Sequence, residues 1–394
     1  MTDATPRRGI GWQILAILAI GLVFRLIMAY GFDALRGSGF DSDLGLFRFW
    51  ASNLADHGPF GFYDRDFFAD YTPGYLYALW LVGAVGELMG GVGDLIKLPA
   101  ILTDVALGFI VYQMARDLGV SERRATIAGA VVVVNPITWF DSVVWGQVDS
   151  FGTVFLLLSI RELWKARSER AAILAVVAAL VKPQLAILVP IVAAVTIRRA
   201  LWPDGGFGSE SPPPASGFGW ERRTRGWIRI VSTGVAGFAT AVALSAPFGL
   251  SVVSFTGSAP FVDSSLVRLI LSTASTYSYV SVNAYNLWAL FPVDGESMAT
   301  SRGWIADAPT ADATAWASIG PFPAAVVGGL LLALLLFVVV PVLVARRPDR
   351  LTILVGVAVL ALAFFAVPTR VHERYLFPLF AIAAIPFAFS WRWR

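Results

Sequence analysis

The chain has 394 residues, of which 57% are hydrophobic and 14% charged, with a formal net charge of +3 and no cysteine. Disulfides and thiol chemistry are therefore excluded, and two histidines far apart in the sequence argue against a zinc site. So small a net charge gives no indication of nucleic-acid binding. Several apolar runs approach or exceed about 18–20 residues, the length that crosses a bilayer, so the composition predicts a polytopic helical membrane protein.

The N-terminal segment predicts a first membrane span over residues 12–30. Arg7 and Arg8 precede it, and basic residues at the start of a span hold that end in the cytoplasm. No small-residue cleavage site follows, so we expect an anchor that is retained. Arg25, near the outer end of this span, is expected to snorkel to the interface or to face a polar site.

Residues 31–73 are expected to form an outer loop that is unusually rich in charge. They contain seven aspartates and three arginines, and such a concentration of charge must lie in water or line a polar cavity. Within the loop, apolar residues recur at helical spacing at Leu44, Phe47, Trp50, Ala51 and Leu54. This spacing predicts a short amphipathic helix over residues 44–56 in the membrane interface, ended by Gly58-Pro59.

Positive charges between the apolar segments indicate which side each connection occupies. With the basic segments in the cytoplasm, residues 73–89 are expected to form a juxtamembrane or re-entrant helix that does not cross. Residues 199–227 become a cytoplasmic connector, and residues 249–320 an outer region. Further spans are expected at 95–115, 125–138, 150–164, 171–198 (two short helices interrupted at Lys182-Pro183), 230–248, 322–345, 351–367 and 376–390.

The whole chain, residues 1–394, is therefore expected to form one all-α polytopic domain. It would hold about ten transmembrane helices, with juxtamembrane helices on the outer side. We expect it in the plasma membrane, with both termini in the cytoplasm and the polar clusters outside.

Four aspartates stand near the outer ends of the expected elements. Asp41 and Asp43, two residues apart, would point to different faces of a helix, so they do not predict a shared carboxylate pair. One of them could act as a base while the other caps the helix or binds substrate; solvated N-cap aspartates are the alternative. Asp141 and Asp149, with Gln147 between them, either face a cavity or belong to the polar edge of the membrane interface.

Two groups of basic residues suit an anionic ligand. Lys182 lies between apolar runs, and a lysine at such a depth indicates a functional site, with an ion pair to a neighbour such as Asp104 as the alternative. Arg370, His372 and Arg374 form a compact turn. Two arginines with a histidine suit a phosphate, because guanidinium groups match its geometry.

Motifs of several large enzyme classes are missing from the sequence. It has no P-loop, no GxGxxG, no HExxH and no GxSxG with partners. Nucleotide hydrolysis, zinc proteolysis and serine hydrolase chemistry therefore lack support.

Six short motifs follow one another along the chain: FDSD, DYTPGYLY, NPITWFDSVVWGQVDSF, LVKPQ, SVNAYNLW and RVHERYLFP. In this order and with this topology they resemble the GT-C superfamily of membrane glycosyltransferases. Within it they are similar to the prokaryotic mannosyltransferases related to the enzyme that adds the second mannose of GPI anchors. Each motif is short, and the resemblance rests on their order over nearly the whole chain.

The resemblance implies an integral membrane enzyme that transfers a sugar, mannose first of all, from a polyprenyl-phosphate donor to a lipid or glycan acceptor on the outer face, with inversion. The base would be Asp41 or Asp43. The donor phosphate would be bound by Lys182, Arg370, His372 and Arg374. Substrate would be bound by Asp141, Gln147, Asp149, Asn283, Asn286 and Tyr375. No cofactor is expected, fixed cations taking the place of a metal, with a divalent ion left open; membrane lipids are expected partners and nucleic acid is not.

Other functions fit parts of the same pattern. A transporter or flippase of a lipid-linked sugar would use intramembrane charges as a pathway. An enzyme of the same fold could use another sugar or a protein acceptor, and a structural membrane subunit is a third alternative. The sequence shows no inverted repeat, and its polar clusters are expected on one side, which favours an enzyme.

Overall fold

The computed structural model describes residues 10–32, 41–202, 226–256, 258–293, 295, 297, 304–309 and 315–389. This part of the chain is mostly helical. Its only sheet is an antiparallel pair of two-residue strands, β1 (Ser318–Ile319) and β2 (Phe322–Pro323). The protein is therefore all-α in its described part, as the composition predicted.

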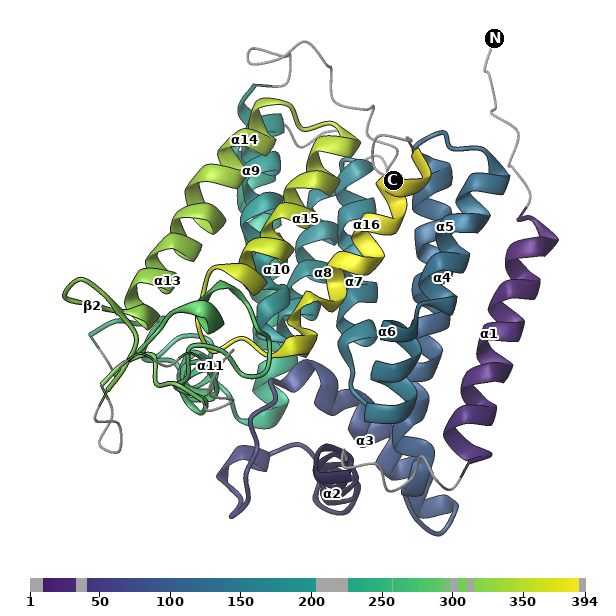
Figure 1. Ribbon diagram of the computed structural model, residues 1–394, viewed down its shortest axis with the longest axis horizontal. Coiled ribbons are helices and arrows are strands. Elements are labelled where there is room, and N and C mark those ends of the chain that lie inside the picture. Colours follow the sequence, from purple (N-terminus) through teal and green to yellow (C-terminus); the bar gives the residue numbers. More distant parts are fainter. Residues whose placement is uncertain are drawn as a thin grey trace.

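Most of the long helices run side by side between two ends of the molecule (Figure 1). They are α1 (Trp12–Tyr30), α4 (Leu98–Asp117), α5 (Glu122–Val134), α7 (Asp149–Trp164), α8 (Ser168–Val181), α9 (Leu188–Leu201), α10 (Trp227–Ser245), α13 (Ala324–Leu334), α14 (Val340–Arg346), α15 (Arg350–Ala366) and α16 (Phe377–Phe389). The π-helical segment η8 (Leu335–Val339) joins α13 to α14 without a turn.

Among the described helices, five are long and apolar enough to cross a membrane. They cover Trp12–Tyr30, Gly93–Asp117, Pro183–Leu201, Trp227–Phe248 and Ala324–Arg346. A sixth span results if the bent pair Glu122–Val134 and Pro136–Trp145 is counted as one. These helices are consistent with a membrane protein, whereas the expected number of about ten spans stays a prediction.

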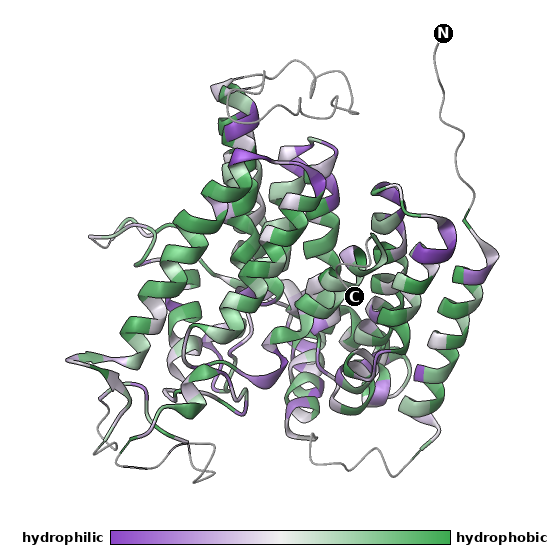
Figure 2. Ribbon diagram, turned by 45° about the horizontal axis from the view of Figure 1, so that its top comes forward, coloured by the Kyte–Doolittle hydropathy of each residue, from purple (hydrophilic) through white to green (hydrophobic). Residues whose placement is uncertain are grey.

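The surface of the bundle also fits a lipid environment. Figure 2 shows apolar residues along the bodies of the helices and hydrophilic residues mainly near their ends. In the span formed by α13 and α14, Leu330 is 67% and Phe337 65% exposed. Soluble monomers rarely expose continuous apolar surface on this scale.

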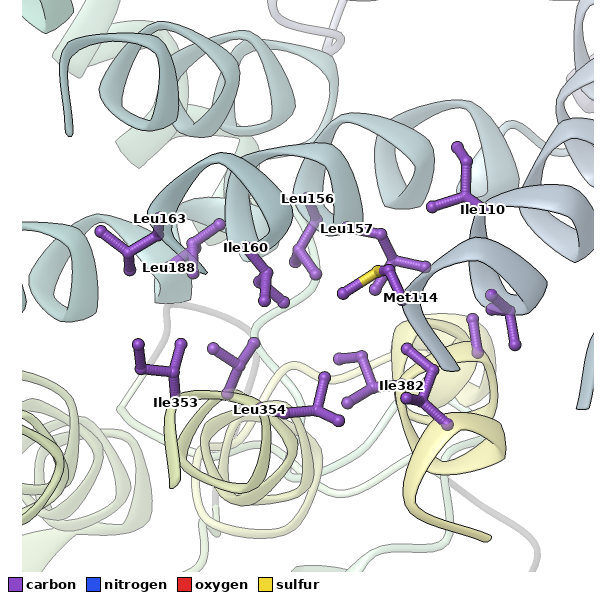
Figure 3. Packing of buried hydrophobic residues seen from close by; sticks show 14 of the residues in the cluster. Ile110, Met114, Leu156, Leu157, Ile160, Leu163, Leu188, Ile353, Leu354 and Ile382 are labelled. Atoms are coloured by element: carbon purple, nitrogen blue, oxygen red, sulfur yellow. The ribbon is translucent and has the colours of Figure 1, made fainter. Parts of the chain in front are cut away.

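One hydrophobic core joins helices that are distant in the sequence. Figure 3 shows side chains of α4, α7, α9, α15 and α16 meeting in it, among them Met114, Ile160, Leu188, Leu354 and Ile382. At one end of this core, Arg199 in α9 donates to the carbonyl oxygens of Leu163 and Pro348. The ends of α7 and α9 and the α14–α15 turn therefore lie together.

The amphipathic helix predicted over residues 44–56 is present as α2 (Asp41–His57), which begins three residues earlier and ends one later, whereas its place in a membrane interface stays a prediction. It lies across the other helices and is seen end-on in Figure 1. All five residues of its predicted apolar face are at most 3% exposed: Leu44, Phe47, Trp50, Ala51 and Leu54. They pack against α3 (Pro73–Leu88), where a Cβ on Gly83 would come within 2.0 Å of the Ala51 carbonyl oxygen. Only a glycine permits this close approach.

The segment expected not to cross the membrane forms α3. This helix is not among the described helices that are long and apolar enough for a span. It begins against the end of α8, since a Cβ on Gly74 would lie 2.4 Å from the Leu180 carbonyl carbon. Its position relative to a membrane stays a prediction.

The predicted interruption at Lys182-Pro183 is confirmed. α8 ends at Val181, and Lys182 takes an extended conformation with φ −145° and ψ 121°. Pro183 then opens the 3-10 turn η5 (Pro183–Ile187), from which α9 continues. Proline has no N–H and disfavours a helical residue before it, so the break follows from the sequence.

Candidate active site

Asp43 lies in the first turn of α2 and is the only one of the two predicted catalytic aspartates whose side chain is described. Its Oδ2 accepts hydrogen bonds from Trp145 Nε1 at 3.0 Å and from Gln147 Nε2 at 2.7 Å. Asp41 is the first residue of α2, and its side chain lies outside the described part of the structure. The structure therefore shows contacts for Asp43 and leaves the role predicted for Asp41 untested.

The local fold explains how two donors reach the same carboxylate. Trp145 ends the π-helical turn η4 (Phe140–Trp145), and Gly146 follows with φ 76°, in the left-handed region. A Cβ on Gly146 would lie 2.2 Å from Leu44 Cδ2. Glycine therefore lets the chain turn directly against α2 and places residues 145 and 147 on either side of Asp43.

A second cluster joins two cations to one carboxylate. Lys182 Nζ lies 2.7 Å from Asp149 Oδ2, and Arg374 Nε lies 3.9 Å from the same oxygen. Lys182 stands in the break after α8, Asp149 begins α7, and Arg374 lies in η9 (Glu373–Leu376). The Lys182 and Asp149 side chains are only 6% and 2% exposed, and that of Arg374 is 16% exposed.

The ion pair considered as the alternative for Lys182 is present, but its partner is Asp149 and not Asp104. Asp104 pairs with Arg25, with 2.9 Å between Asp104 Oδ2 and Arg25 Nε, and both side chains are fully buried. Arg25 therefore does not snorkel to the interface. Asp104 is in α4, and α1 packs against α4, so the cation within reach of Asp104 is Arg25.

Aromatic contacts close these two clusters into one circuit. The Arg374 guanidinium carbon lies 5.4 Å from the centre of the Trp145 ring, and Lys182 Nζ lies 6.0 Å from the centre of the Tyr71 ring. Tyr71 in turn donates from its hydroxyl to Gln147 Oε1 at 3.2 Å. We call this circuit the polar ring; its members are Asp43, Tyr71, Trp145, Gln147, Asp149, Lys182 and Arg374.

Asp141 and Asp70 lie beside the polar ring. Asp141 is 4% exposed, interacts electrostatically with Asp149 and Lys182, and its Oδ2 has no hydrogen-bond partner among the described residues. Burial raises the pKa of Asp70, an effect that Arg374 opposes and Asp43 reinforces. Asp141 was predicted from the sequence, whereas Asp70 was missed as a site residue.

His372 also lies next to the polar ring but without a positive charge. Its ring stands between those of Tyr277 and Tyr375, at 5.0 and 5.2 Å between ring centres. Burial, with Arg374 and Lys182 nearby, lowers the pKa of His372 from 6.5 to about 3. A neutral imidazole keeps one N–H donor, so His372 could hydrogen-bond a phosphate but would not neutralise its charge. Burial raises the pKa of Tyr375 to about 12.

Three further predicted residues have contacts of their own, outside the polar ring. Arg370 binds both carboxylate oxygens of the fully buried Asp307, at 2.7 and 3.1 Å. Asn286 donates to the carbonyl oxygens of Phe365 and Pro368, and Asn283 is exposed and accepts from Trp304 Nε1 at 3.4 Å. The structure does not bring Arg370, Asn283 or Asn286 into the polar ring, and their substrate contacts stay predictions.

Two members of the polar ring were not identified as site residues from the sequence. Tyr71 and Trp145 were not predicted, because an aromatic residue in a membrane chain usually packs in the core or lies in the interface.

Within the described residues, no group of three or more His, Asp or Glu side chains is arranged to hold a metal ion. The expectation of a metal-independent site stays a prediction.

No protein-family model matches this chain, and no curated protein matches it significantly. The polar ring, and the sequence motifs that contain its members, are therefore the basis for proposing a function.

Proposed function

We propose that the protein is a membrane glycosyltransferase of the GT-C type. It would move a sugar, mannose first of all, from a polyprenyl-phosphate donor to a lipid or glycan acceptor on the outer face of the membrane. The observation that carries the proposal is the polar ring, in which a carboxylate, the buried Lys182 and the half-buried Arg374 meet from separate elements, beside helices that could span a membrane.

The origin of the ring members adds support. They come from five of the six motifs on which the resemblance rests, far apart in the sequence. FDSD supplies Asp43, DYTPGYLY supplies Tyr71, LVKPQ supplies Lys182 and RVHERYLFP supplies Arg374. The longest motif, NPITWFDSVVWGQVDSF, supplies the other three members. Motifs that were weak singly therefore converge on one place, as the parts of one site would.

In the proposed reaction, Asp43 acts as the general base. It accepts the proton of an acceptor hydroxyl while that oxygen forms a bond to the anomeric carbon of the donor sugar. The bond from this carbon to the phosphate oxygen breaks, and its electron pair leaves with the polyprenyl phosphate. Attack opposite the leaving group inverts the anomeric centre, so a β-linked donor gives an α-linked product.

Lys182 and Arg374 would stabilise the charge that grows on the leaving phosphate. Fixed cations in a site with little water interact strongly with developing charge and need no reorganisation. Arg374 Nε lies too far from Asp149 for a hydrogen bond and has no hydrogen-bond partner among the described residues. It is thus a free donor for a phosphate oxygen, while Asp149 neutralises the cations before the donor arrives.

The first experiment measures transfer of radiolabelled mannose from polyprenyl-phosphate mannose, with the purified protein and a total lipid extract as acceptor. We expect labelled glycolipid with the parent and a loss of about 100-fold or more in Asp43→Asn. Asp41→Asn and Asp70→Asn test the two other carboxylates as bases. Asp56→Asn is the matched control, since Asp56 lies on the same helix and is exposed.

Each result of this assay has a definite meaning. Transfer with another polyprenyl-phosphate sugar in place of mannose keeps the mechanism and discards the sugar. Loss in Asp41→Asn or Asp70→Asn with full activity in Asp43→Asn moves the base to that residue. Absence of transfer with every lipid-phosphate sugar contradicts the proposal.

One observation favours a second function, a transporter or flippase of a lipid-linked sugar. Asp104 Oδ1 and Asp141 Oδ2 are buried and have no hydrogen-bond partner among the described residues. Buried carboxylates in membrane helices often carry protons along a transport pathway. A transporter would move a lipid-linked sugar between the leaflets of vesicles that contain the protein, and it would transfer no sugar to an acceptor. Asp104→Asn should then slow this movement.

A further inference from the structure

Two fully buried charges lie inside the helical bundle. Arg25 in α1 pairs with Asp104 in α4, with no exposed area on either side chain. The same carboxylate oxygen, Asp104 Oδ2, accepts a hydrogen bond of 2.6 Å from Ser142 Oγ in η4. Burying two charges costs free energy even when they are paired. A pair of this kind within two candidate spans therefore points to a specific role.

The pair stands next to a break in the neighbouring backbone. α5 ends where Asn135-Pro136 opens α6 (Pro136–Trp139). Pro136 has no N–H, and the Ile137 N–H donates to Asn135 Oδ1 instead of continuing the helix. The carbonyl groups of Val132 and Val133 thereby lose the donors that an uninterrupted helix would supply.

Side chains replace both missing donors. Thr138 Oγ1 donates to the Val132 carbonyl oxygen at 2.8 Å, and Arg25 Nη2 donates to the Val133 carbonyl oxygen at 3.0 Å. Arg25 Nη2 also donates to Thr138 Oγ1 at 3.1 Å. The guanidinium group thus satisfies the backbone at the break, as non-helical backbone inside a membrane requires, and ties it to Asp104.

The segment after the break leads directly to the polar ring. Ser142, bound to Asp104, lies in the middle of η4, and Trp145 ends that turn. Gln147 follows two residues later, and both Trp145 and Gln147 donate to Asp43 Oδ2. A shift of η4 would therefore move both donors together.

We propose that Arg25, Asp104 and Ser142 are positioning residues, which hold η4 where Trp145 and Gln147 can orient the Asp43 carboxylate. The inference rests on the proposed function for its effect on reaction rate. Its effect on the η4 backbone does not depend on any activity. Small displacements of catalytic groups lower rates strongly, so the expected loss is about ten- to hundredfold in kcat.

The test compares two buried serines. Ser142→Ala removes the hydrogen bond that joins Asp104 to η4, together with a longer contact of 3.5 Å to the Trp139 carbonyl oxygen. Ser159→Ala is the matched control, because Ser159 is also fully buried and its Oγ donates to the Ala171 carbonyl oxygen at 2.6 Å, between α7 and α8. Two quantities are measured in each protein: amide hydrogen exchange of the peptide covering residues 139–148, and the kinetics of transfer.

We expect faster exchange in this peptide and a lower kcat for Ser142→Ala, with the donor KM and the thermal midpoint near those of the parent. Ser159→Ala should change neither exchange nor kcat. In a Trp145→Phe/Gln147→Ala background, which lacks both donors to Asp43, Ser142→Ala should add less than a twofold further loss, because it acts through those two residues. Asp104→Asn serves as a second variant, with a larger expected effect on exchange.

Unchanged exchange of residues 139–148 in both Ser142→Ala and Asp104→Asn would overturn the inference. So would equal losses of kcat in the two serine variants, or a loss for Ser142→Ala that simply adds to that of the Trp145→Phe/Gln147→Ala double variant. If the parent shows no transfer at all, the proposed function fails, and the exchange measurement alone decides this inference.

Discussion

The Trp145 indole has two neighbours of opposite charge. Its N–H donates to Asp43, and its ring carries the Arg374 guanidinium on one face. Both contacts involve a charged partner, and in the proposed reaction each would place a different group: the base on one side and a phosphate ligand on the other. The two contacts can be separated by a substitution that keeps the ring and removes the N–H.

Trp145→Phe is therefore expected to lower kcat by about tenfold, because a hydrogen bond to a charged group contributes about 1.5–3 kcal/mol. The donor KM should change little, since the aromatic face next to Arg374 remains. Kinetics at varied donor concentration measure the two effects separately. Trp139→Phe is the control, because that ring packs on Phe24 instead, at 5.5 Å between ring centres. A large rise in donor KM with unchanged kcat would contradict this assignment.

His372 gives a prediction for stability. Its folded pKa of about 3 lies below the unfolded value of 6.5, so the unfolded chain binds the proton first as the pH falls. His372 therefore makes its full contribution to the free energy of unfolding above pH 6.5, and this contribution is lost progressively as the pH falls toward 3. We expect the thermal midpoint of His372→Gln to fall less than that of the parent as the pH is lowered from about 7 to about 4.5. His57→Gln, at an exposed position, should follow the parent.

At the scale of elements, the α2–α3 pair controls where Asp43, the proposed base, lies. α2 carries Asp43, and its approach to α3 depends on the missing side chain at Gly83. The other face of α2 is free at Gly45, where an added Cβ would meet nothing within 4 Å. Both glycines lie inside helices, so we expect a change to alanine to lower the stability of the protein at Gly83 and to raise it at Gly45.

Gly83→Ala should destabilise the protein by about 1–3 kcal/mol, because the new methyl group overlaps the backbone of Ala51. It should also reduce transfer, since α2 must move. Gly45→Ala should stabilise by about 0.5–1 kcal/mol through helix propensity alone. Thermal midpoints and transfer rates of the two variants provide the comparison. Equal stability of the two proteins would show that α2 and α3 are not in close contact.

At the scale of the whole molecule, the sequence predicted some levels of structure better than others. Periodicity predicted α2 down to its five buried residues, and a single Lys-Pro pair predicted the break before α9. The number of spans could not be settled in the same way. Helices such as α7, with 16 residues, and α16, with 13, are shorter than a span by length alone.

The site was also predicted unevenly. Polar residues at the ends of apolar runs were visible as candidates, and Asp43, Gln147, Asp149, Lys182 and Arg374 meet in the polar ring. Their pairing was not visible, because it depends on which helices are neighbours. The contacts of Arg370 with Asp307 depend on a loop that is distant in the sequence, which no local pattern could indicate.

The expected topology can be tested on the whole chain because it contains no cysteine. Phe60, after α2, is 78% exposed, and Arg124, near the start of α5, is exposed as well. We expect Phe60→Cys to react with an impermeant thiol reagent only from outside the cell and Arg124→Cys only from the cytoplasm. Reaction of both from the same side would overturn the orientation. Leu88→Cys, at an exposed position at the end of α3, then shows on which side that helix ends.

Asp149 has a consequence for how a catalytic cycle could end. One carboxylate oxygen serves Lys182 and also faces Arg374, so the two cations have an internal counter-ion whenever the site is empty. In the proposed reaction the departing lipid phosphate must compete with this counter-ion for the same cations. Re-pairing with Asp149 would then help to expel the spent carrier, and turnover would depend on an exchange of anions as much as on bond making.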